Sequence, residues 1–314
     1  MEPKIIIIML NWNGKMDTIE CIQSLQKIDY TNYEIICVDN GSSDGSVECI
    51  RDRFPTVRIV ANKQNLGWSG GNNVGIRHAL TMGAEYILLL NNDAIVDAQI
   101  IRAFLDASKQ MRGNTILGAK IYYYSEPKKI QYAGAEFVFG EYFFRHKGQG
   151  FIDDGKQWNQ LEETEYANGA AMFFSKYVVR VVGFFDERFF LNWEEADWCA
   201  RARRMGIKCY FVPEAMVWHK ISASFEGGAK GGAYKYYGRR NRFLWIEKNL
   251  SLFAKMHFFL HQGIDVLRKI KILLQTSSNE KSYMDAKIEL QCFFDYLLRK
   301  FGKGCPTWVS DLRL

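Results

Sequence analysis

The sequence predicts an α/β fold, a doubly wound and mainly parallel sheet covered by helices. The first observation is the apolar run Lys4–Leu10, typical of a strand that is buried on both faces. The second is that strand-like and helix-like segments alternate as far as residue 109, which implies parallel pairing through right-handed crossovers. The third is that polar residues follow each predicted strand, as at the ligand-binding edge of such sheets.

The elements of the first half follow from hydrophobic spacing. After the first strand, Ile19, Ile22, Leu25 and Ile28 recur about every third residue, as on one face of a helix. The next segments, alternately strand and helix, are Tyr33–Val38, Gly45–Phe54, Val57–Ala61, a glycine-rich loop leading into a helix that ends near Met82, Tyr86–Leu90 and Asp97–Lys109. This order predicts four parallel strands.

The pattern changes after about Leu117. Aromatic-rich stretches alternate with Gly, Lys and Asp, which indicates shorter, antiparallel strands. Gly183–Arg204 then reads as a turn into a helix, and Tyr210–Val217 as a strand. From Tyr234 onward the chain is expected to be helical. We therefore expect residues 1–245 to form one domain, with halves 1–115 and 116–245, and residues 246–314 to form a helical extension.

The composition is that of an ordinary globular enzyme, with 48% hydrophobic and 24% charged residues. The seven cysteines include no CxxC pair and are odd in number, so we expect free thiols in a reducing compartment. No export signal is evident, and no apolar stretch approaches the ~20 residues of a spanning helix. These features predict a cytoplasmic protein.

Charge is distributed unevenly. Residues 230–314 contain 16 Lys and Arg against 7 Asp and Glu, whereas residues 1–229 contain 25 against 28. A basic end suits an anionic partner such as a membrane surface or nucleic acid, although a solvated basic face with no partner is the alternative.

Four polar loops follow the predicted strands. They are Asn11-Trp12-Asn13-Gly14, Val38–Ser46, Asn62–Gly75 and Asn91-Asn92-Asp93. Each alone is explained by turns and helix caps, but four at one sheet edge predict a binding crevice. An ionised Asp39 only accepts hydrogen bonds, so it suits a base imide or a ribose hydroxyl, and Asp93 suits a hard divalent cation. The glycines resemble a dinucleotide fingerprint, but they follow the third strand instead of the first.

The order of these motifs resembles the family-two glycosyltransferases with the GT-A fold, and within them the bacterial rhamnosyltransferase-like group. The matching stretches are Val38–Gly45, Asn65-Leu66-Gly67 and Asn91-Asn92-Asp93. The resemblance implies an inverting transfer from a nucleotide-diphosphate sugar, dTDP-rhamnose first and a UDP-hexose second. It also implies Mg²⁺ or Mn²⁺. Asn91 stands where the family has the first Asp of its Asp-x-Asp motif, so Asp93 is the remaining carboxylate for the metal.

The resemblance continues through three later stretches, Ala167–Gly206, Val212–Phe225 and Tyr236–Phe243. Glu194-Glu195 stands where the family has Glu-Asp, whose second carboxylate is the general base. This implies Glu195 as the catalytic base, with Glu194 or Asp197 as the fallback. The alternative is a surface helix start in which Asp197 pairs with Arg201.

The resemblance also assigns binding roles. His219, before a Ser- and Gly-rich segment, is expected to be a metal ligand with Asp93, with a structural histidine as the alternative. Trp193 and Glu194 are expected to contact the acceptor. The expected donor-binding residues are Asn11, Asn13, Asp39, Asn40, Asn65, Gly67, Asn72, Asn91, Asn92 and Arg240, the last of which would neutralise the diphosphate.

Three other functions share some of these features. A sugar-nucleotidyltransferase would need a basic glycine-rich loop after the first strand, and LNWNGKMD is not such a loop. A glycoside hydrolase would use two facing carboxylates and no nucleotide. A non-catalytic nucleotide- or glycan-binding module would bind the donor without turnover.

The extension contains one apolar seam. Its residues are Phe253, Met256, Leu260, Ile264, Leu267 and Leu274, and Lys255, Arg268, Lys269 and Lys271 lie beside it. The seam can pack on its own domain, or it can lie in the headgroup layer of an anionic bilayer. We expect the second: an enzyme at the cytoplasmic face of a membrane that acts on a glycan or lipid-linked acceptor, with no nucleic-acid partner.

Overall fold

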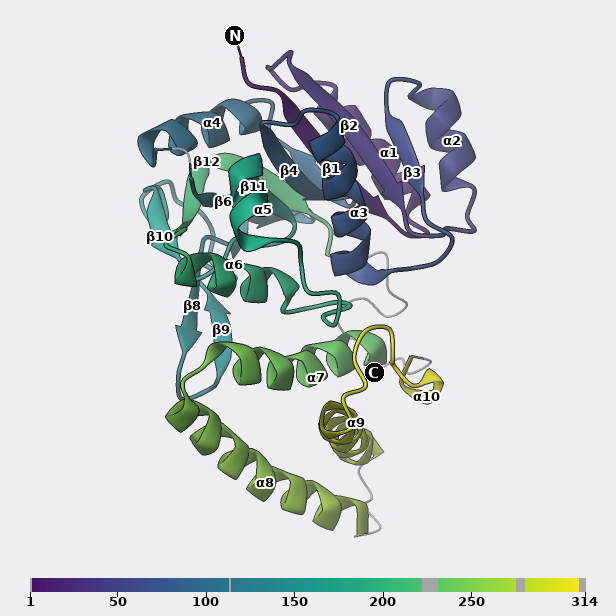
Figure 1. The fold of residues 1–314 in the computed structure, drawn as a ribbon, viewed down its shortest axis with the longest axis vertical. Coiled ribbons are helices and arrows are strands. Elements are labelled where there is room, and N and C mark those ends of the chain that lie inside the picture. Colours follow the sequence, from purple (N-terminus) through teal and green to yellow (C-terminus); the bar gives the residue numbers. More distant parts are fainter. Residues whose placement is uncertain (1, 113, 222–230, 275–279, 311–314) are drawn as a thin grey trace.

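The computed structural model describes residues 2–112, 114–221, 231–274 and 280–310. A ten-stranded mixed sheet runs through residues 5–219, and the C-terminal helices pack together at one end of it (Figure 1). The Ser- and Gly-rich segment predicted after His219 falls on residues 222–230, outside the described residues.

The sheet has the strand order β10-β12-β6-β11-β4-β1-β2-β3, with β5 beside β12 and β7 beside β6. Its strands are β1 Ile5–Asn11, β2 Tyr33–Asp39, β3 Arg58–Ala61, β4 Tyr86–Asn91, β5 Ala94–Val96, β6 Ile116–Tyr123, β7 Glu126–Tyr132, β10 Glu162–Thr164, β11 Ala171–Ser175 and β12 Cys209–His219. The predicted parallel set β1–β4 is confirmed. Because β11 is antiparallel to both β4 and β6, and β12 is parallel to β6, strands β1, β2, β4 and β12 end at one edge.

Helices cover both faces of this sheet. Successive residues of a strand point to opposite faces. Phe173 of β11 accordingly stacks on Phe104 of α4 (Ile100–Gln110), whereas Phe174 packs on Trp198 of α6 (Glu194–Arg204). The remaining helices of this part are α1 Lys15–Leu25, α2 Ser46–Arg53, α3 Gly67–Thr81 and α5 Lys176–Val182. The result is the three-layer architecture that the sequence predicted.

The sequence predicts that the glycine-rich stretch is a loop as far as Gly75, but the structure differs. Helix α3 begins at Gly67, so most of these glycines are helical. A Cβ atom at Gly71 would lie 2.3 Å from Leu10 Cδ1 on β1. The glycines therefore allow the helix backbone to approach the sheet closely, and hydrophobic spacing alone does not distinguish this from a loop.

A hairpin and the four helices after β12 complete the described part of the chain. Strands β8 (Ala135–Val138) and β9 (Phe143–His146) pair as a separate two-stranded sheet. The helices α7 (Gly232–Asn249), α8 (Leu252–Leu274), α9 (Glu280–Leu297) and α10 (Thr307–Ser310) follow β12, and α9 packs on both α7 and α8. The predicted start of the extension at residue 246 thus falls inside α7. Within the described ranges, no helix combines the length and the hydropathy needed to cross a bilayer.

Candidate active site

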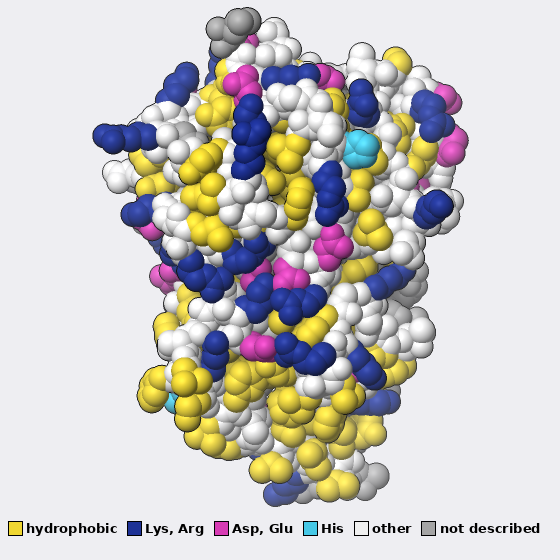
Figure 2. Space-filling model, viewed as in Figure 1, with side chains coloured by type: hydrophobic (Ala, Val, Ile, Leu, Met, Phe, Trp, Pro, Cys, Tyr) yellow, Lys and Arg dark blue, Asp and Glu magenta, His cyan; other side chains and the backbone are white. Residues whose placement is uncertain are grey.

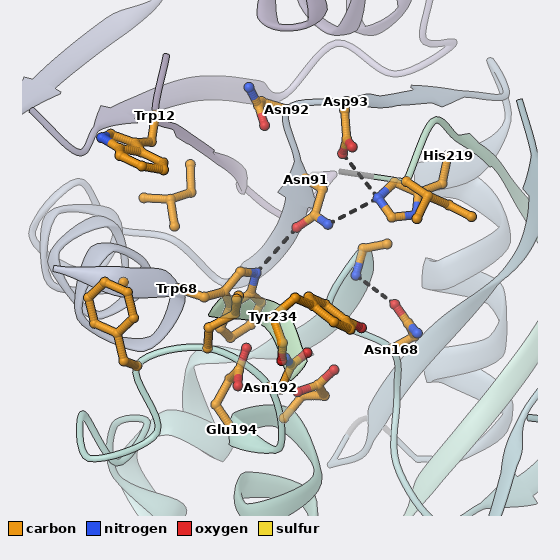
Figure 3. Close-up of a pocket in the computed structure, with 18 of the residues that line it drawn as sticks. Trp12, Trp68, Asn91, Asn92, Asp93, Asn168, Asn192, Glu194, His219 and Tyr234 are labelled. Carbon is orange, nitrogen blue, oxygen red and sulfur yellow. Dashed lines mark hydrogen bonds and ion pairs between the residues drawn. The ribbon is translucent and has the colours of Figure 1, made fainter. Parts of the chain in front are cut away.

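A cavity of about 250 Å³ lies at the sheet edge where β1, β4 and β12 end. Figure 3 shows Asp93 and His219 on one side of this cavity and Glu194 on the opposite side. Of the residues predicted for the site, the cavity is lined by Asn40, Asn65, Gly67, Asn91, Asn92, Asp93, Glu194, Glu195 and His219. Residues as far apart in the chain as Asn40 and His219 therefore face one space.

Asn40 and Asn65 fix the point where α3 begins. Asn40 Nδ2 donates to the carbonyl of Gly67 at 3.0 Å, and the backbone N–H of Gly67 donates to Asn65 Oδ1 at 2.8 Å. Gly67 has a φ of +74°, and a Cβ atom there would lie 2.3 Å from the carbonyl oxygen of Phe190. Only glycine fits this turn, which presents the N-terminus of α3 beside the cavity.

Asn11 and Asp39 are fully or almost fully buried under the loops and do not line the cavity. Asp39 accepts hydrogen bonds from Asn11 Nδ2 (2.9 Å) and from the backbone N–H groups of Gly41 (3.1 Å) and Ser42 (2.9 Å). Asn11 Oδ1 in turn accepts from Asn92 Nδ2 at 3.2 Å. Asn11 thus links the loops, and its direct contact with the donor stays a prediction. Base reading by Asp39 stays a prediction.

Asp93 and His219 meet at the exits of β4 and β12. Asp93 Oδ1 lies 3.0 Å from His219 Nε2, and Asn91 Nδ2 lies 3.2 Å from the same nitrogen (Figure 3). On the other side of the ring, His219 Nδ1 lies 3.2 Å from Gln131 Oε1. Gln131 Oε1 can accept a hydrogen from Nδ1, and Asp93 Oδ1 can accept one from Nε2. A cation bound at Asp93 would require the tautomer with hydrogen on Nδ1, whose Nε2 lone pair could serve as a second ligand.

These two side chains fit a divalent cation that shares its ligands with a diphosphate. The described part of the lining contains the carboxylates of Asp93, Glu194 and Glu195 but no Lys or Arg. A bound diphosphate would therefore find carboxylates where it needs positive charge. A hard cation on Asp93 and His219 would keep most coordination positions for phosphate and water oxygens, as Mg²⁺ commonly does. No cluster of three or more His, Cys, Asp or Glu side chains occurs among the described residues, so protein ligands alone would not complete such a site.

Glu194 and Glu195 begin α6 from a strained turn. Asn192 and Trp193 both have positive φ, 68° and 75°, which is costly for residues with a Cβ atom. Helix α7 holds this turn. Asn241 Nδ2 donates to the carbonyls of Leu191 (2.8 Å) and Asn192 (3.0 Å). The strain therefore aims the first turn of α6, with both carboxylates, at the cavity.

The two glutamates are shielded from water, and the charge of Glu195 affects the pKa of Glu194. Glu194 is 4% exposed, and Glu195 is half-buried against the cavity. Burial, followed by the nearby charge of Glu195, raises the pKa of Glu194 well above its usual range. Burial also raises the pKa of Glu195 to about 7, although the backbone N–H of Gly169 opposes this shift. Glu194 Oε2 and Glu195 Oε2 are buried and accept no hydrogen bond from the described residues.

Asp197, the fallback base, does not reach the cavity. Its carboxylate is fully buried, 3.0 Å from Arg201 Nε and 2.8 Å from Lys248 Nζ. The pairing with Arg201 is the one expected for a structural helix start. Because this carboxylate does not line the cavity, it does not face an acceptor bound there, and Glu194 and Glu195 remain the candidates for the base.

The packing of α7 gives other partners to two residues that were predicted to contact the acceptor and the donor. Trp193 donates from Nε1 to the carbonyl of Gly238 at 2.8 Å and packs on Trp245, so it supports the turn and does not line the cavity. Arg240 is fully buried, and its Nη2 donates to Asn241 Oδ1 at 3.0 Å and to the carbonyl of Gly302 at 3.0 Å. It therefore orients Asn241, and its predicted contact with a diphosphate stays a prediction.

Two further predicted donor contacts lie elsewhere. Asn72 is buried within α3, and its Nδ2 donates to the carbonyl of Trp68 at 2.9 Å. Asn13 Oδ1 accepts from the backbone N–H of Ser43 at 2.8 Å and links the loops after β1 and β2. Neither lines the cavity.

The structure adds residues that the pattern did not single out. Gln131 on β7, His146 on β9 and Tyr234 on α7 all line the cavity, together with Trp12, Asn168 and Asn192. His146 Nε2 lies 2.5 Å from the Tyr166 hydroxyl, and burial lowers the pKa of His146 to about 4. Their sequence signal is weak because tertiary pairing, not spacing, brings them to the sheet edge.

Comparison with known proteins agrees with this geometry. Residues 5–180 match the family described as Glycosyl transferase family 2. The low-salt glycan biosynthesis hexosyltransferase Agl10 of Haloferax volcanii is 29% identical over 260 residues, which cover 81% of this chain and 78% of that protein. The dTDP-rhamnosyl transferase RfbF of Shigella flexneri is 21% identical over 306 residues, covering 92% of this chain and 94% of that protein.

Among solved structures, GalNAc-T7 with UDP, GalNAc and Mn²⁺ is similar with a TM-score of 0.63 and 13% identity. The match covers 94% of this chain but 56% of that one, so this chain spans little more than half of that protein. At this identity the likeness establishes the fold alone, and the fold is GT-A. With a family match over more than half of its length, the chain belongs to glycosyl transferase family 2 and is a glycosyltransferase.

Proposed function

We propose that the enzyme transfers a sugar from a nucleotide-diphosphate donor to a hydroxyl of a glycan or lipid-linked acceptor, with inversion at the anomeric carbon. The observation that carries this proposal is the arrangement of charge in the cavity. A carboxylate–imidazole pair, Asp93 and His219, faces two desolvated glutamates across the space that the donor sugar would occupy.

Asp93 and His219 would hold a divalent metal, Mg²⁺ or Mn²⁺, together with the donor diphosphate. Bound there, the metal would supply positive charge for the nucleotide diphosphate as it leaves. Gln131 would keep the imidazole in the ligand tautomer. Asn91, whose Nδ2 lies 3.2 Å from His219 Nε2 and whose Oδ1 accepts from Trp68 Nε1 at 3.2 Å, would border the metal position.

Glu195 would act as the general base on the acceptor hydroxyl. A pKa near 7 makes its carboxylate available and sufficiently basic at neutral pH. Burial, followed by the charge of its neighbour, raises the pKa of Glu194 and favours its protonated form, which would donate a hydrogen bond to the acceptor instead of removing its proton. A single base on the face opposite the leaving group gives inversion.

The donor is proposed to be dTDP-rhamnose, with a UDP-hexose as the second choice. The name of the Shigella flexneri relative specifies dTDP-rhamnosyl transfer, and the structurally similar GalNAc-T7 was solved with UDP and Mn²⁺. A lipid-linked acceptor would place the reaction at the cytoplasmic face of a membrane.

A donor screen tests the proposal. The chain is incubated with dTDP-rhamnose and a panel of UDP- and GDP-sugars, with Mg²⁺ or Mn²⁺ or with EDTA, and mass spectrometry follows loss of donor. We expect metal-dependent loss of one donor, slow when water is the acceptor, and no loss in the Glu195→Gln variant.

The same screen separates the alternatives. Donor that binds but is never consumed would indicate a binding module. Pyrophosphate released from a nucleoside triphosphate and a sugar phosphate would indicate a nucleotidyltransferase. Sugar released from a glycan without any nucleotide would indicate a hydrolase.

A further inference from the structure

Helix α8 has two apolar faces, and only one of them is covered. On the inner face Phe258 is fully buried and packs on Phe243 of α7, and Phe259 stacks on Tyr296 of α9. On the outer face all six seam residues predicted from the sequence are between 45 and 81% exposed, so the seam does not pack on its own domain. Leu252 and Ile270 extend the exposed stripe, which occupies an arc of roughly 120° along the whole helix.

The exposed hydrophobic side chains of this stripe lie together and are not scattered singly over the surface. Figure 2 shows hydrophobic side chains gathered over the lower part of the molecule, where Figure 1 places α8. Phe139 and Phe143 of the neighbouring hairpin are also more than half exposed, and the Tyr142 hydroxyl between them lies 2.5 Å from His257 Nδ1 on α8. A contiguous exposed patch of this kind marks an interaction surface.

The charges of α8 favour an anionic occupant. The helix carries Lys255, Arg268, Lys269 and Lys271. Lys269 faces α9, where its Nζ lies 3.0 Å from Glu289 Oε2, which leaves Lys255, Arg268 and Lys271 for an anionic occupant. The single acid of α8, Asp265, lies 3.2 Å from Arg268. A symmetric dimer on this stripe would bring the basic rim of one copy against the same rim of the other. Lipid phosphates would instead neutralise these basic side chains while the stripe enters the acyl boundary.

We propose that the exposed face of α8 docks the enzyme on an anionic bilayer, with the stripe in the headgroup layer and the basic side chains on lipid phosphates. The β8–β9 hairpin links this surface to the cavity, since Tyr142 touches α8 and His146 lines the cavity. Docking would thus present the acceptor side of the cavity to a substrate confined to the membrane.

Vesicle co-sedimentation of the full chain, without donor or metal, tests this proposal independently of catalysis. The vesicles contain phosphatidylcholine alone or phosphatidylcholine with phosphatidylglycerol. We expect binding to the anionic vesicles that weakens with salt. Leu260→Glu with Leu267→Glu should reduce binding by about tenfold or more, because two charges replace apolar groups that would enter the bilayer. Arg268→Gln with Lys271→Gln should reduce binding to anionic vesicles by about fivefold per residue.

The matched control changes two exposed apolar residues elsewhere, Tyr177→Glu with Met205→Glu, which are 48% and 52% exposed. This control should bind like the wild type, and circular dichroism should show that all variants are folded. Equal binding to neutral and anionic vesicles, or equal loss in the control, would overturn the proposal. So would a dimer in sedimentation equilibrium that Leu260→Glu with Leu267→Glu converts to monomers, with no vesicle binding by either protein.

Discussion

The carboxylate of Asp39, buried under the loops beside the cavity, and the carboxylates of Glu194 and Glu195, which line the cavity, are held in opposite ways. On the donor side Asp39 accepts three hydrogen bonds from Asn11, Gly41 and Ser42. On the acceptor side one oxygen each of Glu194 and Glu195 is buried and accepts none from the described residues. Asp39 therefore stabilises a loop, whereas the glutamates are kept in a state of high proton affinity. The comparison teaches that Asp39 is fixed as part of the scaffold, whereas the two glutamates have the surroundings that the proposed proton transfer needs.

The largest expected effect is on the donor side, at Asp93. Asp93→Ala should reduce transfer at least about 10³-fold, because it removes a charged metal ligand from a cavity with no Lys or Arg among its described residues. Isothermal titration should show loss of metal-dependent donor binding. Unchanged donor binding in this variant, or full wild-type activity in EDTA, would contradict the metal site.

The second effect is on the acceptor side. Glu195→Gln should lower kcat by roughly 10²-fold or more while donor affinity stays the same, because only proton removal is damaged. Glu194→Gln is the matched control and should have a smaller effect. If the larger loss occurs in Glu194→Gln, the base is the neighbouring residue.

The third effect is a pH profile. With donor and acceptor at limiting concentration, the rate should fall about tenfold for each pH unit below about 7, because Glu195 must be ionised to accept a proton. The titrating groups around it include Glu194, Tyr166 and Tyr234. Burial first, and then the charge of Glu195, raises the pKa of both tyrosines. A rate that is flat from pH 5 to 8 under rate-limiting chemistry would exclude this base.

These differences explain how much the sequence could predict. Strand alternation places the ends of β1, β2, β4 and β12 at one edge, so Asp93 and His219 could be expected to meet although they are far apart in the chain. Arg240 could not be placed in this way. Its burial depends on how α9 and the segment near Gly302 fold over α7, and a basic residue in a polar motif has the same pattern whether it faces phosphate or backbone carbonyls.

The predicted base is a similar case. The first turn of α6 was expected to carry it, but the spacing of acids does not distinguish Asp197, which is held by Arg201 and Lys248, from its neighbours. Nor does it reveal that a strained turn at Asn192 and Trp193 aims the helix. The ion pair of Asp197 with Lys248 and the position of the strained turn both depend on α7, which begins about 40 residues after that turn.

The fourth effect tests that turn. Asn241→Asp keeps the acceptor for Arg240 but removes both hydrogen bonds to the carbonyls of Leu191 and Asn192. We expect kcat to fall about tenfold with little change in donor affinity, because a small displacement of the catalytic carboxylates weakens proton transfer. Asn32→Asp, on the surface at the opposite end of the sheet, is the control. A change in donor affinity alone would place Asn241 on the donor side.

The smallest effect is on stability. Burial holds the pKa of Glu194 above its unfolded value of 4.5, so the folded protein keeps a proton that the unfolded chain has already lost. The folded state must therefore lose stability as the pH rises above about 4.5, over a window that extends to the folded pKa. Glu194→Gln cannot ionise, so its free energy of unfolding relative to wild type should rise by on the order of 1 kcal/mol between pH 4.5 and 8. Taking this difference cancels the constant cost of burying the amide. Urea unfolding at both pH values measures it, with Glu214→Gln on the exposed side of β12 as the matched control. If the difference in free energy of unfolding between Glu194→Gln and wild type stays constant or falls as the pH rises, Glu194 is as well solvated as the control. The contrast with Asp39 would then rest on Glu195 alone.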